Sequence, residues 1–263
     1  MKKSKLSIII CAILVLVFVV MSFAGCSGTK RSVDKEYEYN TEIITNENAP
    51  VEGDADVTAI NGFVEDKEQK LLTLPYTIPD TGLVVTAVGK YTGPYIESGV
   101  NEEAENALAI VIKNTTDKVV SYSSIEVQLN DKEVRTFSPT NLPPNQSTLS
   151  FPINKVISYD DVKQFTVNDT LVVPTDSLPL LEGKVGVDFK DGEFIITNLT
   201  NENLGDVYVR YKNFSEGNVY LGGITYSVVV NEMTAYETKK VAAESYSEEN
   251  SVIISVESII PLT

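Results

Sequence analysis

The sequence contains no histidine and no tryptophan, and its 263 residues include only two cysteines. Without histidine, a serine or cysteine nucleophile lacks its usual general base, and the common zinc sites lack a ligand. Without tryptophan, the commonest platform for stacking a sugar is missing, although the 13 tyrosines are a substitute. These absences exclude triads of the Ser-His-Asp or Cys-His type, and we expect no catalytic residue and no cofactor.

Basic residues are also scarce. Lysine and arginine number 21, against 37 aspartates and glutamates, which gives a net charge of −16. Such a surface is repelled by nucleic acids and by anionic lipid headgroups, because binding to either depends on lysine and arginine. We therefore expect no nucleic-acid partner. A basic or neutral partner fits the charge better, and solubility alone is the simpler explanation of it.

Both cysteines lie near the N-terminus. Cys11 lies inside an uninterrupted apolar run, residues 8–21, which follows three lysines. Lysines, an apolar run and a small-residue exit are typical of a secretory signal peptide, here residues 1–25. The alternative is an uncleaved transmembrane anchor, but a span needs about twenty apolar residues. Cys26 alone would remain after cleavage, so the fold must be held by its core and not by disulfides.

The exit of this segment, Phe23-Ala24-Gly25-Cys26, resembles the bacterial lipobox, in which the cysteine is acylated and becomes the new N-terminus. The resemblance implies a thioether-linked diacylglycerol on Cys26. Two acyl chains hold a protein on a membrane because each buried methylene contributes about 0.8 kcal/mol. We therefore expect a lipid-anchored protein on the extracytoplasmic side of the cell membrane.

The rest of the chain divides by composition. Residues 26–71 are polar and acidic, which predicts a lipidated N-terminus followed by a disordered tether. Short β-branched runs separated by turn residues follow, such as "SYSSIEVQLN", and only "YDDVKQF" indicates a helical turn. This pattern predicts an all-β fold of two tandem immunoglobulin-like antiparallel β-sandwiches. We place them at 72–173 and 181–263, joined by a linker at 174–180.

The two halves look like copies of each other. "IVIKNTTDKVVSYSSIEVQL" parallels "FIITNLTNENLGDVYVRY", and in each an apolar strand ends in Asn-x-Thr, at Asn114 or Asn198. A strand-ending asparagine tolerates left-handed backbone geometry and bonds its own backbone. The pattern resembles the small FxLYD-type sandwich domains of lipoproteins from low-GC Gram-positive bacteria, although the Phe-x-Leu-Tyr-Asp motif itself is absent. The resemblance implies a fold and no activity.

Two loops are candidate binding sites. In "GKYTGPYIESGVNEEAEN" (89–106), Tyr91 and Tyr95 flank a Gly-Pro turn and Glu97 begins an acidic run. Tyrosine-rich loops make good contact surfaces, but these tyrosines could equally pack over the mouth of the sandwich, which is the simpler interpretation. In the second loop (212–226), Gly222-Gly223 within a strand indicates a bulge or a close backbone approach.

The stretch "GDADVTAINGF" (53–63) faintly resembles a calcium-binding loop. Asp54 and Asp56 are spaced like calcium ligands, but Ala59 stands where a calcium loop needs glycine, so we expect an acidic linker and no metal.

Together these features favour a non-catalytic surface lipoprotein with an interaction or adhesion role toward a protein or cell-wall partner. One alternative is a glycan or small-ligand capture module associated with a transporter, which predicts a tyrosine-lined pocket. A hydrolase is the third hypothesis, and it would need a pair of acidic residues in a cleft, one of them with a raised pKa.

Overall fold

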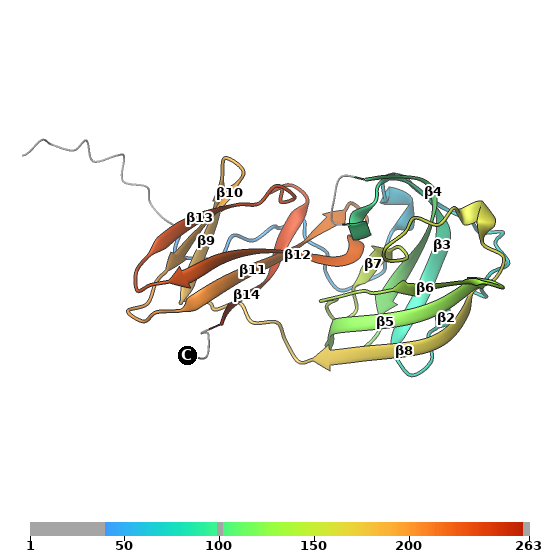
Figure 1. The fold of residues 1–263 in the computed structure, drawn as a ribbon, viewed down its shortest axis with the longest axis horizontal. Coiled ribbons are helices and arrows are strands. Elements are labelled where there is room, and N and C mark those ends of the chain that lie inside the picture. Colours follow the sequence, from blue (N-terminus) through green and yellow to red (C-terminus); the bar gives the residue numbers. More distant parts are fainter. Residues whose placement is uncertain (1–39, 99–101, 260–263) are drawn as a thin grey trace, which may run out of the picture. The chain divides into compact units, whose positions relative to one another are not determined.

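The computed structural model describes residues 40–98 and 102–259, and they are nearly all β (Figure 1). The signal segment, Cys26 and the start of the predicted tether lie outside the described residues. The helical content of these two ranges is three short 3-10 turns: η1 (Val57–Ala59), η2 (Ile96–Ser98) and η3 (Tyr159–Asp161). Turn η3 falls in the stretch where a helical turn was predicted. No helix in the described ranges is long and apolar enough to cross a membrane.

The first sandwich packs a small sheet, in the order β6-β5-β8, against one half of a larger sheet. Its core consists of inward-facing residues such as Ile110 and Ile112 on one side and Ile125, Val127 and Leu129 on the other, as the alternation predicted. The strands of the larger sheet here are β1 (Phe63–Glu65), β2 (Tyr76–Thr77), β3 (Leu83–Pro94), β4 (Glu103–Asn114) and β7 (Ser147–Ser150). Those of the small sheet are β5 (Val119–Asn130), β6 (Glu133–Phe137) and β8 (Thr166–Thr175).

The second sandwich repeats this plan with its own core, in which Val187 and Phe194 pack toward Val207 and Val256. One sheet has the order β13-β10-β9, and the other is the remaining half of the larger sheet, β12-β11-β14. Its strands are β9 (Val185–Lys190), β10 (Glu193–Asn198), β11 (Gly205–Ser215), β12 (Val219–Met233), β13 (Thr238–Ala242) and β14 (Ser251–Ile259).

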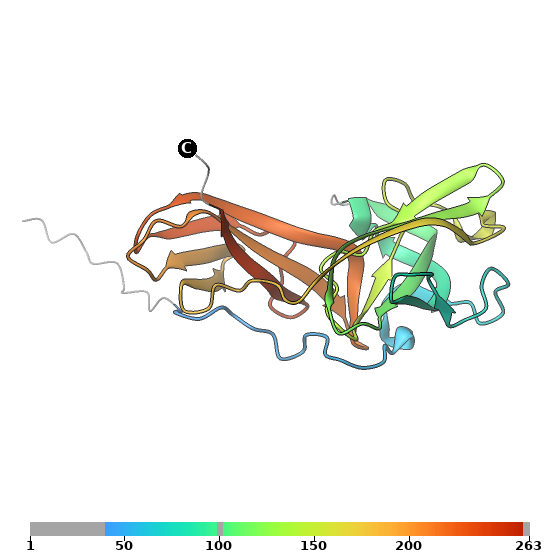
Figure 2. The same ribbon diagram turned by 90° about the horizontal axis from the view of Figure 1, so that it is seen from below.

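The two sandwiches share one continuous sheet, ordered β1-β3-β4-β7-β12-β11-β14. Figure 2 shows the long β12, in orange, reaching from one sandwich to the other. The first residues of β12, Val219–Leu221, pair in parallel with Ser147–Leu149 of β7. The same β12 then continues along β11 to residue 233. The sandwiches are therefore joined by main-chain hydrogen bonds as well as by the connection that was predicted between them.

The segment before β1 differs from the expected tether. From Asn40 onward it is part of the folded unit: Ile43 bridges Val187 of β9 in parallel, and Asn218 exchanges side-chain hydrogen bonds with the main chain of Val51. Farther along, Ile60 and Phe63 are buried against the outer surface of β3 and β4. The tether prediction was wrong for residues 40–71, because scattered apolar residues in an acidic background still bury a second face of the sheet.

This cover explains the composition of β4. Its residues 107–112 are buried without alternation, because the first core lies on one face and the N-terminal segment on the other. A strand buried on both faces reads as a continuous apolar run.

The predicted internal repeat is confirmed at the level of hydrogen bonds. The Nδ2 of Asn114 donates to the carbonyls of Leu142 (3.1 Å) and Pro143 (3.0 Å), and its Oδ1 accepts from the N–H of Thr116 (3.0 Å). Asn114 ends β4, and its counterpart Asn198 ends β10. Each side chain therefore ties the end of a strand to the segment that connects the two sheets of its sandwich.

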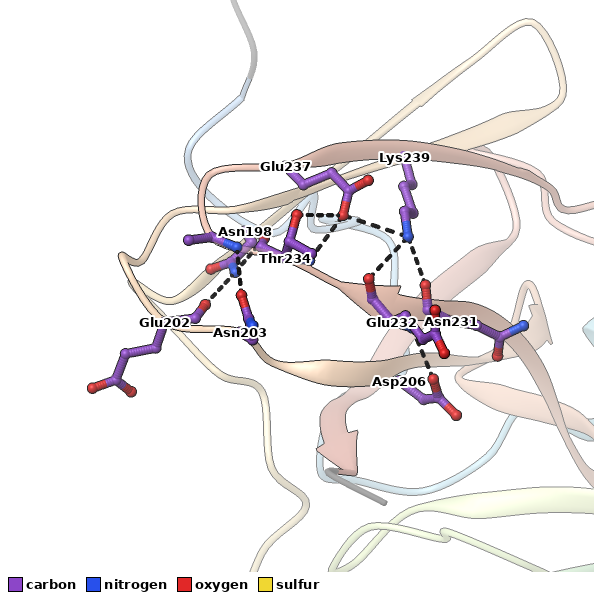
Figure 3. A network of polar contacts seen from close by, with 10 residues as sticks. Asn198, Glu202, Asn203, Asp206, Asn231, Glu232, Thr234, Glu237 and Lys239 are labelled. Atoms are coloured by element: carbon purple, nitrogen blue, oxygen red, sulfur yellow. Dashed lines mark hydrogen bonds and ion pairs between the residues drawn. The ribbon is translucent and has the colours of Figure 1, made fainter. Parts of the chain in front are cut away.

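The second copy uses the same atoms (Figure 3). The Nδ2 of Asn198 donates to the Thr234 carbonyl (2.8 Å), and its Oδ1 accepts from the N–H of Thr200 (2.9 Å). Left-handed geometry at the asparagines was the wrong reason for this pattern, since both are extended strand residues. Positive φ values occur instead next to the carbonyls that the asparagines contact, at Asn141 (47°) before Leu142 and at Tyr236 (55°) in the turn that contains Thr234.

Candidate functional site

The two loops singled out from the sequence meet in the folded chain. Glu97 lies on η2, and its Oε1 accepts hydrogen bonds from the N–H groups of Phe151 (2.9 Å) and Gly223 (2.9 Å). Ser150 Oγ lies 3.4 Å from the same oxygen. A carboxylate from the first loop thus holds the main chain of the second, next to the place where β7 and β12 pair.

Lys212 is the second ionisable group at this point, and only 1% of it is exposed. Its Nζ donates to main-chain carbonyls of three neighbouring positions, Gly222 (3.4 Å), Gly223 (3.4 Å) and Ile224 (2.7 Å). A fourth carbonyl, that of Thr140, lies at 3.2 Å and comes from the first sandwich. We call Glu97, Lys212, Gly222 and Gly223 the junction cluster.

Burial dominates the electrostatics of the junction cluster. It raises the pKa of Glu97 to about 7, against the opposing effect of the hydrogen bonds from Gly223 and Phe151. It lowers the pKa of Lys212 to about 7, against the opposing effect of the Glu97 carboxylate. The second carboxylate oxygen, Oε2, is buried and has no hydrogen-bond partner. Burial without full pairing disfavours the charged forms of both groups.

Gly222 and Gly223 are required here by space, as their position inside a strand predicted. Gly222 has φ +80°, and a Cβ on it would lie 2.4 Å from Cγ2 of Ile96. A Cβ on Gly223 would lie 2.9 Å from the carbonyl oxygen of Ser138. The close neighbour is therefore a side chain at Gly222 and another main chain at Gly223.

The two candidate tyrosines are interior residues. Tyr91 and Tyr95 are 4% and 2% exposed, and both rings pack on Phe151, with centroids 4.8 Å and 6.1 Å away. The hydroxyl of Tyr95 donates to the carbonyl of Pro152, and burial raises its pKa to about 12. The simpler interpretation, that these tyrosines are packing residues, agrees with their burial, but they pack with Ile60 and Phe63 on the outer face of β3 and β4 and not over the mouth of the sandwich. The first loop therefore contributes core aromatics and a buried carboxylate.

A group of exposed apolar residues lies elsewhere, on the outer face of the β6-β5-β8 sheet. Tyr122 of β5 stands opposite Val173 of β8, and Leu171 follows two residues away on the same face. Their exposed fractions are 45%, 44% and 55%. We call these three residues the apolar strip. Strand β8 was missed in the sequence, although "TLVVPT" is β-branched; the proline inside the run is typical of an edge strand.

Like charges face each other beside the apolar strip. Glu126 of β5 is directly opposite Asp169 of β8, and both side chains are exposed. Opposed like charges weaken a strand pair. Among the described residues, no ion pair is recorded for either carboxylate, so this end of the face carries uncompensated negative charge.

A groove of about 650 Å³ lies on the second sandwich, where the N-terminal segment crosses it. Its lining mixes polar and aliphatic residues, among them Thr41, Ile44, Leu180, Leu199 and Ile253. Tyr91, Tyr95 and Glu97 lie in the other sandwich, so the loops selected from the sequence do not build this groove.

Within the described ranges, no cluster of three or more acidic or cysteine side chains is arranged to hold a metal ion. The junction cluster occupies its polar atoms with main-chain partners, which suits a structural role. The apolar strip is left facing solvent. No protein-family model, curated protein or solved structure matches this chain.

Proposed function

We propose that the chain is a non-catalytic, lipid-anchored interaction protein of the extracytoplasmic membrane surface, and that it binds a partner protein through the apolar strip. The observation that carries the proposal is the grouping of Tyr122, Leu171 and Val173 on one exposed face. Single exposed apolar residues are ordinary, but a contiguous group of this kind is typical of an interaction site.

The chemistry of the strip supports this use. Tyrosine is enriched at the buried centre of protein interfaces, and covering an exposed leucine or valine removes apolar surface from water, which favours association. The surrounding surface is acidic, which favours a basic or neutral partner. The absence of histidine and the closed junction cluster support a role without catalysis.

Membrane attachment is the second part of the proposal, and it depends on the lipobox resemblance at Cys26. Metabolic labelling with an alkyne fatty acid, followed by membrane fractionation, tests it directly. We expect label and membrane association for the wild-type chain, and loss of the label in Cys26→Ser. Equal labelling of both chains would contradict the proposed anchor.

The interaction itself is tested by cross-linking the full-length protein in its native cells and quantifying captured proteins by mass spectrometry. The strip variant carries Tyr122→Ser, Leu171→Ser and Val173→Ser. The matched control carries Val64→Ser, Val229→Ser and Tyr236→Ser, at residues that are also exposed.

With the strip variant, we expect the recovered amount of at least one captured protein to fall by about tenfold or more. This loss is equivalent to about 1.4 kcal/mol of binding free energy. The control variant should retain that protein. Equal recovery of every captured protein with the strip variant and the wild-type chain would refute the proposed surface.

A further inference from the structure

Within residues 40–98 and 102–259, no strand pairs with the outer edge of β8, whereas most matching edges of the repeated plan are covered. In the second sandwich β14 takes the place of β8, and its edge is held by a hydrogen bond from the N–H of Val256 to the carbonyl of Pro179 (2.8 Å). The edge of β7 is paired with β12, that of β3 with β1, and that of β9 with the segment at Ile43. Among the described residues, no main-chain partner is recorded on the outer side of β8.

Strand β8 also carries little protection against pairing. Natural edge strands are commonly guarded by lysines, by proline or by being short. The edge strand β13 carries Lys239 and Lys240, whereas β8 has ten residues, no lysine or arginine, and one proline near its end, Pro174. A long open edge next to exposed apolar side chains is a template for strand addition.

The direction of its main-chain groups can be followed along the strand. The N–H of Thr170 donates to the carboxylate of Asp169 (2.9 Å). On β5, Ser123 lies opposite Val172 and turns its carbonyl to Ser138, away from β8, so the pairs of Ser123 with Val172 and of Ile125 with Thr170 are the non-hydrogen-bonded ones and Thr170 faces the outer edge. Because main-chain groups alternate between the two sides of a strand, Val172 faces the same edge. Its side chain packs toward the first core, which leaves the amide of Val172 as the central donor of the open edge.

The side chains along β8 specify what an added strand should carry. Asp169, Leu171 and Val173 are exposed at alternate positions on the outer face. Directly opposite residues of neighbouring strands interact, so a basic residue beside Asp169 would also offset the repulsion from Glu126. Apolar residues beside Leu171 and Val173 would extend the apolar strip.

We propose that β8 binds an extended segment of a partner protein by strand addition. The segment presents one basic and two apolar residues at alternate positions, aligned with Asp169, Leu171 and Val173. This inference rests on the proposed function and adds to it the mode of binding and the chemistry of the partner.

The test uses the full-length protein in detergent micelles and capped, fluorescent seven-residue peptides of threonine. In the matching peptides, lysine, valine and valine occupy every second position, in either direction along the chain. The control peptide has the same composition with the lysine and valines consecutive. A second control replaces lysine by glutamate.

We expect one of the two matching peptides to bind about tenfold or more tightly than both controls, as measured by fluorescence anisotropy. Hydrogen exchange should slow at the amide of Val172 in that complex. Asp169→Asn should weaken binding of the matching peptide that carries lysine. It should leave unchanged the affinity for the same peptide with serine in place of that lysine. The direction of the better peptide reports whether the added strand is parallel or antiparallel.

Failure of both matching peptides to bind, or equal affinity for the consecutive control, would overturn strand addition. So would binding without added protection at Val172. The proposed function is tested separately by the cross-linking comparison of the strip variant with the wild-type chain. That comparison does not depend on pairing of main chains, so it can succeed when strand addition fails.

Discussion

At the scale of single residues, the junction cluster contains a buried glutamate carboxylate and a buried lysine. Both side chains form hydrogen bonds to the main chain of β12. The carboxylate of Glu97 accepts from the N–H of Gly223, and the ammonium of Lys212 donates to the carbonyls of Gly222 and Gly223. Burying each charge is costly, and main-chain dipoles offset part of the cost. We infer that the two side chains define the path of β12, since both hold the peptide unit between Gly222 and Gly223.

The raised pKa of Glu97 predicts a pH dependence of stability. Burial raises this pKa from 4.5 to about 7, so between these values the folded chain binds more protons than the unfolded chain. The stability from protonated Glu97 is complete below about pH 4.5 and is lost as the pH rises toward 7. Relative to Glu97→Gln, the free energy of unfolding should fall by up to about 3 kcal/mol over this range.

Urea denaturation of wild type and Glu97→Gln at several pH values between 4 and 8 measures this difference. Glu52→Gln, at an exposed glutamate, controls for the loss of one acidic group. A difference between wild type and Glu97→Gln that stays constant across the range would contradict the prediction.

Residue patterns predicted some positions well and others for the wrong reason. The Asn-x-Thr repeat located Asn114 and Asn198 correctly, because a buried amide at the end of a strand must satisfy several hydrogen bonds. Tyr91 and Tyr95 were selected for their composition, and composition does not say whether a loop folds back onto a sheet. Their burial depends on Phe151, about sixty residues away, which a local pattern cannot reveal.

At the scale of elements, β12 depends on a glycine pair where it passes η2. Gly222 combines a positive φ with a Cβ position 2.4 Å from Ile96, whereas Gly192 has a similar φ of +83° and no atom within 4 Å of its Cβ position. The two glycines therefore separate backbone strain from steric overlap. Left-handed strain alone costs about 1–2 kcal/mol for an alanine.

We predict that Gly192→Ala lowers the free energy of unfolding by about this amount. Gly222→Ala should lower it by about 1–3 kcal/mol more, because the new methyl group must displace Ile96. Chemical denaturation of the two variants gives the comparison. Equal losses would show that the contact with η2 relaxes freely and that overlap contributes nothing.

The elements that the sequence did not predict share a physical cause. Strand β8 is an edge strand with a proline. The segment at 40–71 contains no run of apolar residues long enough to predict a strand. Both are ordered by long-range partners, β5 for the former and the outer face of β3 and β4 for the latter. Strands with strong alternation, such as β5 and β11, were recognisable because a single buried face sets their period.

At the scale of the whole molecule, three connections tie the two sandwiches together. The first is the parallel pairing of β7 with β12. The second is the N-terminal segment, which contacts Val187 in one sandwich and buries Phe63 in the other. The third is the set of hydrogen bonds across the junction: Lys212 donates to the carbonyl of Thr140, Glu97 accepts from the N–H of Gly223, and the N–H of Thr140 donates to the carbonyl of Gly223 (2.8 Å). The covalent connection after β8 is therefore one tie among several.

These ties predict a single cooperative unfolding transition for the described part of the chain. Two independent sandwiches would melt separately, but neither can unfold here without breaking the β7–β12 pairing and exposing the residues that the N-terminal segment covers. Differential scanning calorimetry should give one peak, with a calorimetric enthalpy equal to the van't Hoff enthalpy. Two resolved peaks would contradict the shared sheet as a unit of stability.

A cut between the sandwiches gives a sharper form of the same prediction. A protease recognition site inserted after the exposed Ser177 leaves β8 and β9 intact. Because the cut breaks one covalent tie and none of the three non-covalent ones, the two fragments should still co-elute on size exclusion at micromolar concentration. The same cut in a chain carrying Gly222→Ala, which disturbs the β12 path, should release more of the separated fragments. Separation of the fragments in the unsubstituted chain would mean that the connection after β8, and not the shared sheet, holds the molecule together.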